Sequence, residues 1–458
     1  MNTLSKSLAL AGVSLLLQSC VSLLPPGNHA ATSLDPANGY GVFNARRKPI
    51  GDHQVILAFS GGGTRAAALS YGVLQELRDT QIIDPQQQPE RLLDEVDLIS
   101  SVSGGSFTAA YYGLFGDDIF RNYEKDFLRK SVQSSLINNL LSPSYWFRAM
   151  FSGINRTDMA VNYYDRTIFH GATFADIPLD KRPFIEINAT DLSTGAHFSF
   201  AQGYFDVLCT DLLQFPVARA VTASSGVPVA FPPVTLKNHS DSCNPRESYL
   251  GPLLNKTEFD NPYEKELIHS FNSYLDAGQR PYIHLVDGGV SDNLGLRAVL
   301  DRNELINKDM AAWLQRSPVR DLLIILVNAE VKPKKSLDQS YQAPSMVATA
   351  GALTDSLISR YTVETRTQIR KQLEEFDRQA KAGGQDVRFY FVEVDFSALD
   401  SPGLQQYFNN LPTTLELDDA EIDQLIAAGR QLLRESEPYQ QFLSRNRGRL
   451  VGDPGKPH

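Results

Sequence analysis

The stretch Asp97-Leu98-Ile99-Ser100-Ser101-Val102-Ser103-Gly104-Gly105-Ser106 predicts a buried strand that turns sharply into a helix. The apolar run before the turn is typical of a strand, and the residues that follow, 107–114, are typical of a helix. A serine on such a tight turn has its hydroxyl lifted out of the backbone, beside the free N–H groups of the helix. We therefore interpret Ser103 as a catalytic nucleophile; the alternative is a serine that only caps the helix.

Two further predicted strands also end in glycine-rich turns. Residues 55–59 precede Ser60-Gly61-Gly62-Gly63-Thr64-Arg65, and residues 282–286 precede Asp287-Gly288-Gly289. Because glycine lacks a Cβ, the N–H groups of Gly61, Gly62 and Gly63 can converge on one negatively charged oxygen. Their spacing matches neither a P-loop nor a dinucleotide-binding turn. Ligand sites lie at the carboxyl ends of strands in such sheets, so these donors, the hydroxyl and a carboxylate are expected to meet there.

The residue types and their spacing do not decide which residue is the general base. A catalytic triad would need a histidine, and the interior candidates are His197 and His284. His284 lies three positions before Asp287 on one predicted strand, so the two side chains point to opposite faces of the sheet. An aspartate can serve alone when burial raises its proton affinity and it lies within hydrogen-bond reach of the serine hydroxyl.

Strands alternate with helical stretches along the chain, which predicts an α/β fold with a mostly parallel central sheet and helices on both faces. The fully apolar run 322–327 predicts a central strand, and 389–394 predicts the last strand. We expect residues 51–330 to form the main domain, with a polar insertion at about 235–280. Residues 331–458 are expected to form an α/β extension packed on the same domain.

Composition excludes several classes of protein. The 458 residues are 42% hydrophobic and 21% charged, which is ordinary for a globular protein and argues against global disorder. The formal net charge of −10 argues against a nucleic-acid partner, because phosphate binding needs a basic face. No apolar run after residue 24 approaches the roughly 20 residues needed to span a bilayer.

The N-terminal segment predicts the localisation of the protein. A short apolar stretch ends in Leu17-Gln18-Ser19-Cys20, which resembles a bacterial lipobox. Residues 1–19 would then be a signal peptide, Cys20 would carry acyl chains that bind a membrane surface, and residues 20–50 would be a tether. No acidic residue follows directly, so we expect an exported lipoprotein, in the outer membrane if the cell has two. The alternatives are a plain signal peptide with an incidental cysteine, or a short uncleaved anchor.

Two other features leave alternatives open. Export would place Cys209 and Cys243 in an oxidising compartment, where an even pair is commonly a disulfide; the alternative is two buried free thiols. The bulky cluster Tyr145-Trp146-Phe147 with Met150-Phe151 predicts either an interfacial lid or ordinary core contacts.

Five ordered blocks together carry a family resemblance. They are the Ser60–Arg65 turn, the Ser101-x-Ser103-x-Gly105 elbow, residues 188–195, residues 223–233, and Asp287-Gly288-Gly289. Over about residues 53–295 the chain resembles the patatin-like phospholipase family. Two positions depart from that pattern, because Ser101 and Ala66 stand where the family often has glycine.

The resemblance implies a three-layer patatin-like fold with a Ser103–Asp287 dyad. It also implies an oxyanion hole from Gly61, Gly62 and Gly63, supported by Arg65, and hydrolysis of phospholipid or lysophospholipid esters without metal or cofactor. The expected partner is therefore a membrane lipid. The alternatives are a catalytically silent lipoprotein that binds lipid or a protein partner, and a serine esterase or peptidase with a non-lipid substrate.

Overall fold

The computed structural model describes residues 24–451 apart from 36, 38, 43, 45, 48, 84–86, 143–153, 182, 229–230, 306–312, 314, 332–337 and 340. The expected acylation site Cys20 and the aromatic cluster around Trp146 therefore lie outside the described residues.

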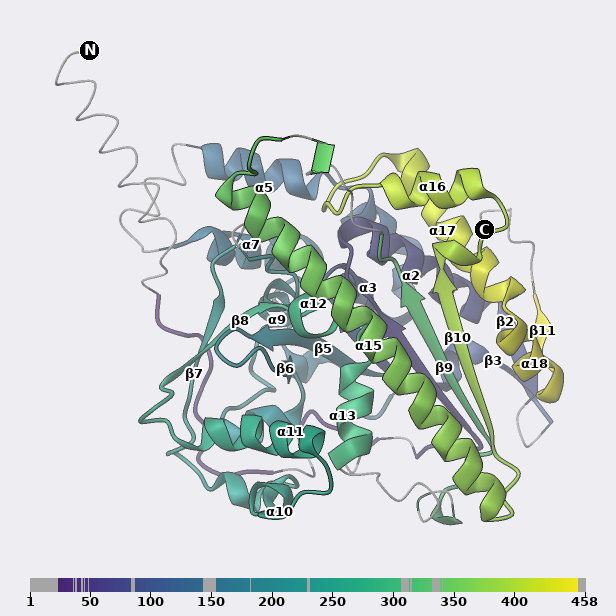
Figure 1. Ribbon diagram of the computed structural model, residues 1–458, viewed down its shortest axis with the longest axis horizontal. Coiled ribbons are helices and arrows are strands. Elements are labelled where there is room, and N and C mark those ends of the chain that lie inside the picture. The colour runs from purple at the N-terminus through teal and green to yellow at the C-terminus, as the bar shows by residue number, and fades with distance from the viewer. Residues whose placement is uncertain are drawn as a thin grey trace.

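One eight-stranded sheet forms the centre of the molecule (Figure 1). Its strands run in the order β10 (Arg388–Asp395), β9 (Asp321–Asn328), β1 (His53–Phe59), β4 (Val96–Val102), β5 (Phe184–Asp191), β8 (Tyr282–Asp287) and β7 (Val234–Lys237), and β6 (His197–Ser199) also pairs with β5. The first five are parallel to their neighbours, whereas β8 and β6 run antiparallel to β5. A small antiparallel sheet contains β11 (Arg449–Leu450), β2 (Thr80–Ile83) and β3 (Pro89–Arg91).

Helices cover both faces of the large sheet (Figure 1). The described helices of eight or more residues are α2 (Gly63–Arg78), α3 (Gly104–Phe115), α5 (Val132–Leu141), α7 (Arg156–Tyr164), α9 (Val217–Ser224), α11 (Pro262–Asn272), α13 (Arg297–Leu305), α15 (Met346–Ala382), α16 (Pro402–Asn410), α17 (Asp419–Glu435) and α18 (Glu437–Arg445). Shorter ones are α4 (Ile119–Tyr123), α8 (Gln202–Val207), α10 (Gly251–Leu254) and α12 (Gly289–Asp292).

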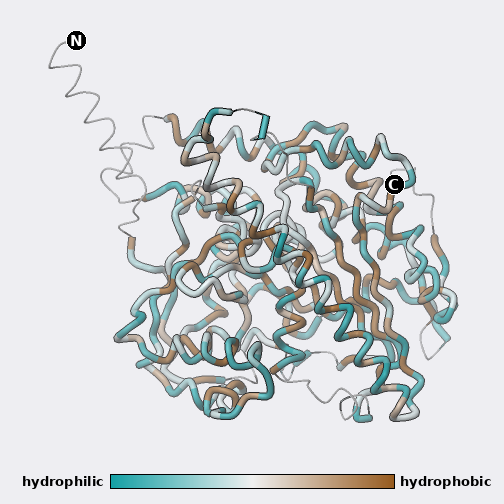
Figure 2. Tube along the Cα trace, viewed as in Figure 1, coloured by the Kyte–Doolittle hydropathy of each residue, from teal (hydrophilic) through white to brown (hydrophobic). Residues whose placement is uncertain are grey.

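The two layers of helices contact alternate residues of the same strands. On β1, Ile56 lines a cavity together with Ile369 of α15. His53, on the opposite face, has its ring against Phe442 of α18. This alternation follows from the two-residue period of a strand, and Figure 2 shows the hydrophobic residues gathered along the strands between the helices. The predicted mostly parallel α/β fold with helices on both faces is confirmed.

The central strands are buried because both faces are covered. Every residue of β9 and β5 is buried, as the apolar run 322–327 predicts for β9. Among the helices that the structure describes, none combines the length and the hydropathy that crossing a bilayer requires.

The segment expected to be a tether is packed against the domain, so that expectation is wrong for its described part. Tyr40 is fully buried, and its hydroxyl donates a hydrogen bond to the carbonyl of Ile185 at 2.9 Å. Nearer the N-terminus, the Asn28 side-chain amide donates to the carbonyl of Lys237, and the Ala31 N–H donates to the carbonyl of Cys209. The sequence of this segment does not predict these contacts, because each of them joins residues that lie far apart in the chain.

Candidate active site

Ser103 lies at the junction between β4 and α3, where the sequence predicts the nucleophile turn. Its φ of 50° and ψ of −119° place a non-glycine residue in an unusual backbone conformation, as in other nucleophile turns. The turn also packs tightly, since a Cβ on Gly104 would lie 2.0 Å from the carbonyl oxygen of Gly63. Gly105 follows in the first turn of α3. The geometry therefore needs a glycine directly after the serine.

The side chains of Ser103 and Asp287 form a hydrogen-bonded pair. The Ser103 hydroxyl donates to Oδ2 of Asp287 at 3.0 Å, and the Gly289 N–H donates to Oδ1 at 2.8 Å. Both side chains are buried, with exposures of 8% and 7%. Burial raises the pKa of Asp287 to about 6, against the smaller lowering by these two hydrogen bonds. The carboxylate can therefore accept a proton near neutral pH.

Asp287 reaches Ser103 by a route that the sequence does not predict. The strand β8 runs antiparallel to β5, so its carboxyl end does not follow the direction of the other strands. It overlaps only the last three residues of β5, and it stops where Asp287 pairs with Ala189. On the other side of β5, Val102 pairs with Asn188, one position earlier. Asp287 and Ser103, which directly follows Val102, thus flank the end of β5 at nearly the same level of the sheet.

The glycine turn after β1 faces this pair. A side chain on Gly61 would force Asn293 to shift, because a Cβ there would lie 2.4 Å from Oδ1 of Asn293 and 3.3 Å from Cβ of Ser103. Its N–H donates to the carbonyl of Asn293 at 2.9 Å, so the expectation that it is an oxyanion donor needs correction. Within the described chain, the N–H groups of Gly62 and Gly63 have no hydrogen-bond acceptor and stay available.

Arg65 supports the glycine turn without touching the pair. Its guanidinium is buried and donates to the carbonyls of Ala329 and Leu411, at 2.9 and 2.8 Å, and to Oγ1 of Thr413 at 3.2 Å. Burial lowers its pKa to about 10. Two of the three acceptors, Leu411 and Thr413, come from the part of the chain after residue 330, which connects that part to the site.

The sequence does not predict a set of buried hydroxyls next to Ser103. The Ser103 N–H donates to Oγ of Ser224 at 2.9 Å, and the Ser224 hydroxyl donates to the carbonyl of Asn188 at 2.6 Å. The Ser106 hydroxyl lies 2.9 Å from Oγ of Ser224 and 3.2 Å from Oγ of Ser101. Ser101 donates onward to the carbonyl of Glu186. The sequence signal for Ser224 is that it lies in one of the ordered family blocks, at residues 223–228. The block alone assigns no role to this serine.

The structure brings neither candidate histidine to Ser103. The ring of His197 is buried, with Nε2 2.9 Å from Oδ1 of Asn188 and Nδ1 3.2 Å from Oδ2 of Asp301. His284 is exposed and lies 3.1 Å from the hydroxyl of Thr235.

Gly288 and Gly289 open the short helix α12 directly after Asp287. Among the described residues, no group of three or more His, Cys, Asp or Glu side chains is placed to hold a metal ion.

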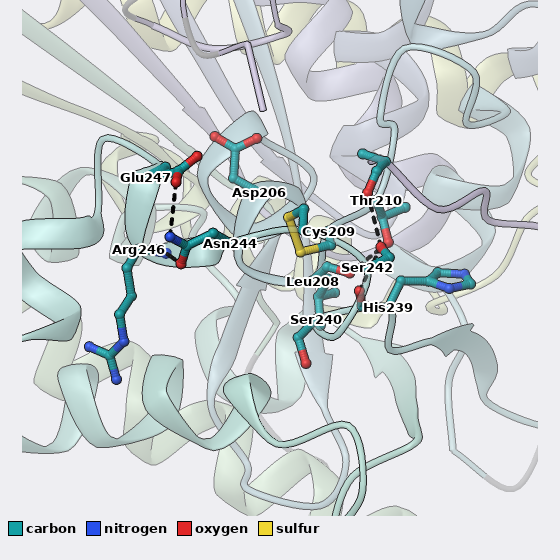
Figure 3. The surroundings of a disulfide bond; sticks show 12 residues. Asp206, Leu208, Cys209, Thr210, His239, Ser240, Ser242, Asn244, Arg246 and Glu247 are labelled. Atoms are coloured by element: carbon teal, nitrogen blue, oxygen red, sulfur yellow. Dashed lines mark hydrogen bonds between the residues drawn. A yellow bond between two sulfur atoms is a disulfide. The ribbon is translucent and has the colours of Figure 1, made fainter. Parts of the chain in front are cut away.

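The two remaining cysteines are joined. Cys209 and Cys243 form a disulfide with a Cα–Cα distance of 5.6 Å. Figure 3 shows the bond between the loop after α8 and the segment that leads to Asn244, whose amide donates to Glu247. The bond joins two segments that lie 34 positions apart in the chain.

Two helices and the first part of a third, all next to the site, carry almost no charge. The helices α5 and α16 contain no charged residue, and residues 346–359 of α15 contain only Asp355, in a chain that is 21% charged. The helices α5 and α16 and the beginning of α15 lie at the top of the molecule in Figure 1, and the rest of α15 runs away from that end. Large apolar side chains are exposed on them: Ile137, Leu141, Met346, Leu353, Leu357 and Leu404.

These helices are linked to the site through short series of contacts. Gln133 of α5 accepts a hydrogen bond from Thr414, whose carbonyl accepts one from the Thr64 N–H beside the glycine turn. The chain leaves α16 at Asn410 and reaches Arg65 through the Leu411 carbonyl one residue later. On the other side, Ile358 of α15 lies 3.5 Å from the position that a Cβ of Gly289 would take.

Comparisons with known proteins bear on this site in different ways. A search of curated proteins gave no match. The solved structure of human GIVD cytosolic phospholipase A2 is similar at 13% sequence identity and a TM-score of 0.33, over 59% of this chain and 42% of that protein. This chain thus spans less than half the length of that protein. The family model described as patatin-like phospholipase matches residues 57–300, which is more than half of the chain, and the chain therefore belongs to the patatin-like phospholipase family.

Proposed function

We propose that this protein is a serine lipid acyl hydrolase of the phospholipase A or lysophospholipase type, with Ser103 as nucleophile and Asp287 as general base. The observation that carries the proposal is the 3.0 Å hydrogen bond from the Ser103 hydroxyl to the buried Asp287 carboxylate. Membership of the patatin-like phospholipase family supports a lipid ester as substrate.

The proposed reaction has two steps. In the first, Asp287 takes the proton of the Ser103 hydroxyl while Oγ attacks the ester carbonyl carbon. The resulting oxyanion accepts hydrogen bonds from the N–H groups of Gly62 and Gly63. As the C–O bond to the alcohol breaks, Asp287 gives its proton to the leaving oxygen. In the second step, water attacks the acyl-enzyme carbonyl carbon and Asp287 takes a proton from that water. The bond between the acyl carbon and Ser103 Oγ then breaks, Asp287 returns the proton to Oγ, and the fatty acid leaves.

The surroundings of the site favour a lipid over a peptide or a small ester. In α5, α16 and residues 346–359 of α15, which carry exposed apolar side chains, the only charged residue is Asp355, which suits contact with hydrocarbon. We expect Leu353→Asp to lower the hydrolysis of phospholipid vesicles at least tenfold while hydrolysis of a soluble short-chain ester is unchanged. Val363→Asp, exposed further along α15, is the matched control. Equal loss on both substrates would contradict this role.

Labelling with a fluorescent alkyl fluorophosphonate tests the proposed function. Ser103 Oγ would bond to phosphorus as fluoride leaves and Asp287 takes the hydroxyl proton. Peptide mass spectrometry would locate the label. Ser103→Ala should abolish both labelling and ester hydrolysis, while Ser193→Ala, at an exposed serine, should keep both. An unlabelled active protein, or equal labelling of Ser103→Ala, would exclude the serine mechanism. A protein that folds but neither labels nor turns over would favour the silent lipoprotein.

We further propose that the protein is exported and anchored to a membrane, in the outer membrane if the cell has two, through acyl chains on Cys20. The lipobox-like sequence before Cys20 supports this proposal. Growth with an alkyne-bearing fatty acid should label the wild type, and Cys20→Ser should remove the label and release the protein into the soluble fraction. A labelled Cys20→Ser variant would refute it.

A further inference from the structure

The segment that follows α16 lies directly against the glycine turn. We call residues 411–416 the 411–416 loop; it lies outside the family match over 57–300. The Thr64 N–H donates to the carbonyl of Thr414 at 2.8 Å. A Cβ on Gly63 would lie 2.2 Å from that same carbonyl oxygen and 3.0 Å from the Thr414 nitrogen. The backbone of the 411–416 loop therefore touches the Gly63 Cα itself, which has a φ of +62° that favours glycine.

Gly63 is packed equally closely on its other side. There, the backbone of Gly104, directly after the nucleophile, approaches the Gly63 carbonyl so closely that no side chain fits between them. The residue that carries one of the two free N–H groups is thus enclosed between the nucleophile turn and the 411–416 loop. A shift of the loop would change the position of that N–H group relative to Ser103.

Several side chains hold the 411–416 loop in this position. Arg65 donates to the Leu411 carbonyl and to the Thr413 hydroxyl, as described above. On the outer side, the Thr414 hydroxyl donates to Gln133 at 2.6 Å, and the Ser134 N–H donates to Glu416 at 2.9 Å. The loop is therefore bonded to the helix that follows the glycine turn and to α5.

The helix after the loop holds the far end of α2. Arg434 of α17 pairs with Glu76 at 2.7 Å, and Arg430 pairs with Asp79 at 2.7 Å. Gly429 lets the two helix backbones meet, since a Cβ there would lie 2.4 Å from the carbonyl oxygen of Leu69. The glycine turn opens α2, so α17 and the 411–416 loop fix this helix at both ends.

We propose that the 411–416 loop is a positioning element of the oxyanion hole, setting the distance from the Gly62 and Gly63 N–H groups to the oxyanion on the Ser103-bound intermediate. The inference rests on the proposed function. Oxyanion donors act at about 2.7–3.1 Å, and a displacement of about 1 Å can cost on the order of 100-fold in rate. The loop contacts no reacting atom; it acts through Gly63 and Arg65.

Two substitutions in the full-length protein test the loop without altering the oxyanion donors. Thr413→Val keeps the shape of the side chain but removes the acceptor of Arg65, and Pro412→Gly loosens the exposed loop backbone. Thr413→Ser restores the acceptor. Pro402→Gly, at the other end of α16, is the matched control.

The measurements are kcat and KM on a soluble ester, inhibition by an aliphatic trifluoromethyl ketone, and the midpoint of urea unfolding. The ketone forms an oxyanion on Ser103, so its affinity reports the donors. We expect Thr413→Val and Pro412→Gly to lower kcat and ketone affinity about tenfold, with KM and the midpoint little changed. Thr413→Ser and Pro402→Gly should match the wild type.

Three results would overturn the inference. In the first, both loop variants keep kcat and ketone affinity within twofold of the wild type. In the second, kcat falls only together with the unfolding midpoint and Thr413→Ser does not restore it, which indicates a general structural role. In the third, the wild type neither labels at Ser103 nor hydrolyses esters, which would refute the proposed function as well and is distinguishable because no variant is needed to see it.

Discussion

Asp287→Asn separates the chemical use of the buried carboxyl from its cost to folding. Burial raises the pKa of Asp287 from 3.8 to about 6, a shift of roughly two pH units. At about 1.4 kcal/mol per unit, the folded protein loses roughly 3 kcal/mol of stability when this group ionises. The folded state holds the proton more tightly than the unfolded chain, so the favourable contribution is complete below about pH 4 and is lost as pH rises through 6.

The assay is urea unfolding of the wild type and Asp287→Asn between pH 4 and pH 8. The asparagine does not titrate, so its free energy of unfolding should gain about 3 kcal/mol relative to the wild type from pH 4 to pH 7 and then stay level. Ester hydrolysis should be absent throughout, because an amide cannot take the serine proton. Only the change with pH is interpreted, since different hydrogen bonds of the amide add a constant offset.

A second buried carboxyl supplies the matched control. Burial also raises the pKa of Asp206 to about 6, and its hydrogen bond is to Gln202 rather than to Ser103. Asp206→Asn should show a similar pH-dependent gain in stability with hydrolysis unchanged. A difference between Asp287→Asn and wild type that is flat from pH 4 to pH 8, or turnover retained by Asp287→Asn, would refute the assignment of a raised pKa and a base to this residue.

Three further outcomes are expected. Log kcat/KM of the wild type on a soluble ester should fall by one per pH unit below about pH 6, because protonation of Asp287 removes the base, and should be level above; a profile with no break near pH 6 would contradict this. Ser101→Gly removes hydrogen bonds to Ser106 and the sheet and should lower the free energy of urea unfolding by about 1–2 kcal/mol, with kcat within threefold; a large loss of kcat would instead give Ser101 a catalytic role. Cys243→Ser removes the disulfide to Cys209 and should lower the free energy of urea unfolding by about 3–4 kcal/mol. An unchanged free energy of unfolding would show that the bond does not form in the protein.

The local parts of the site could be predicted from the sequence because they depend on residues close together in the chain. A strand, a serine and two glycines predict the turn at Ser103, and the structure places β4 and α3 on its two sides. The glycines after β1 predict clustered N–H donors for a similar reason. In both cases the backbone conformation is set within a few residues, so the pattern carries the information.

The sequence predicts that Asp287 lies near Ser103, but it does not predict the direction of the strand that carries Asp287. We expected it at the carboxyl edge of a parallel sheet, but β8 runs the other way. It reaches Ser103 only because the pairing of β8 with β5 begins beyond the end of β4. Strand direction and register depend on long-range pairing, and an apolar run with a glycine turn looks the same in either direction.

Contacts between distant segments account for the remaining differences. The Gly61 N–H donates to the carbonyl of Asn293, and the Ser103 N–H donates to the hydroxyl oxygen of Ser224. The partners of Arg65 lie more than 250 positions further along the chain. None of these pairs has a local signature, because a carbonyl or a hydroxyl in a loop has no periodicity that marks it as a partner.

If Cys20 carries the proposed anchor, the packing of the N-terminal segment on the domain limits how far the domain can move from the membrane. Asn28 is already fixed to the domain through Thr210 and Lys237. An anchor at Cys20, as proposed, would leave only residues 21–27 between lipid and domain, a reach of roughly 28 Å at full extension. The catalytic domain would then rest close to the leaflet that holds it and draw its substrate from that leaflet, so product fatty acids would be released back into the same surface.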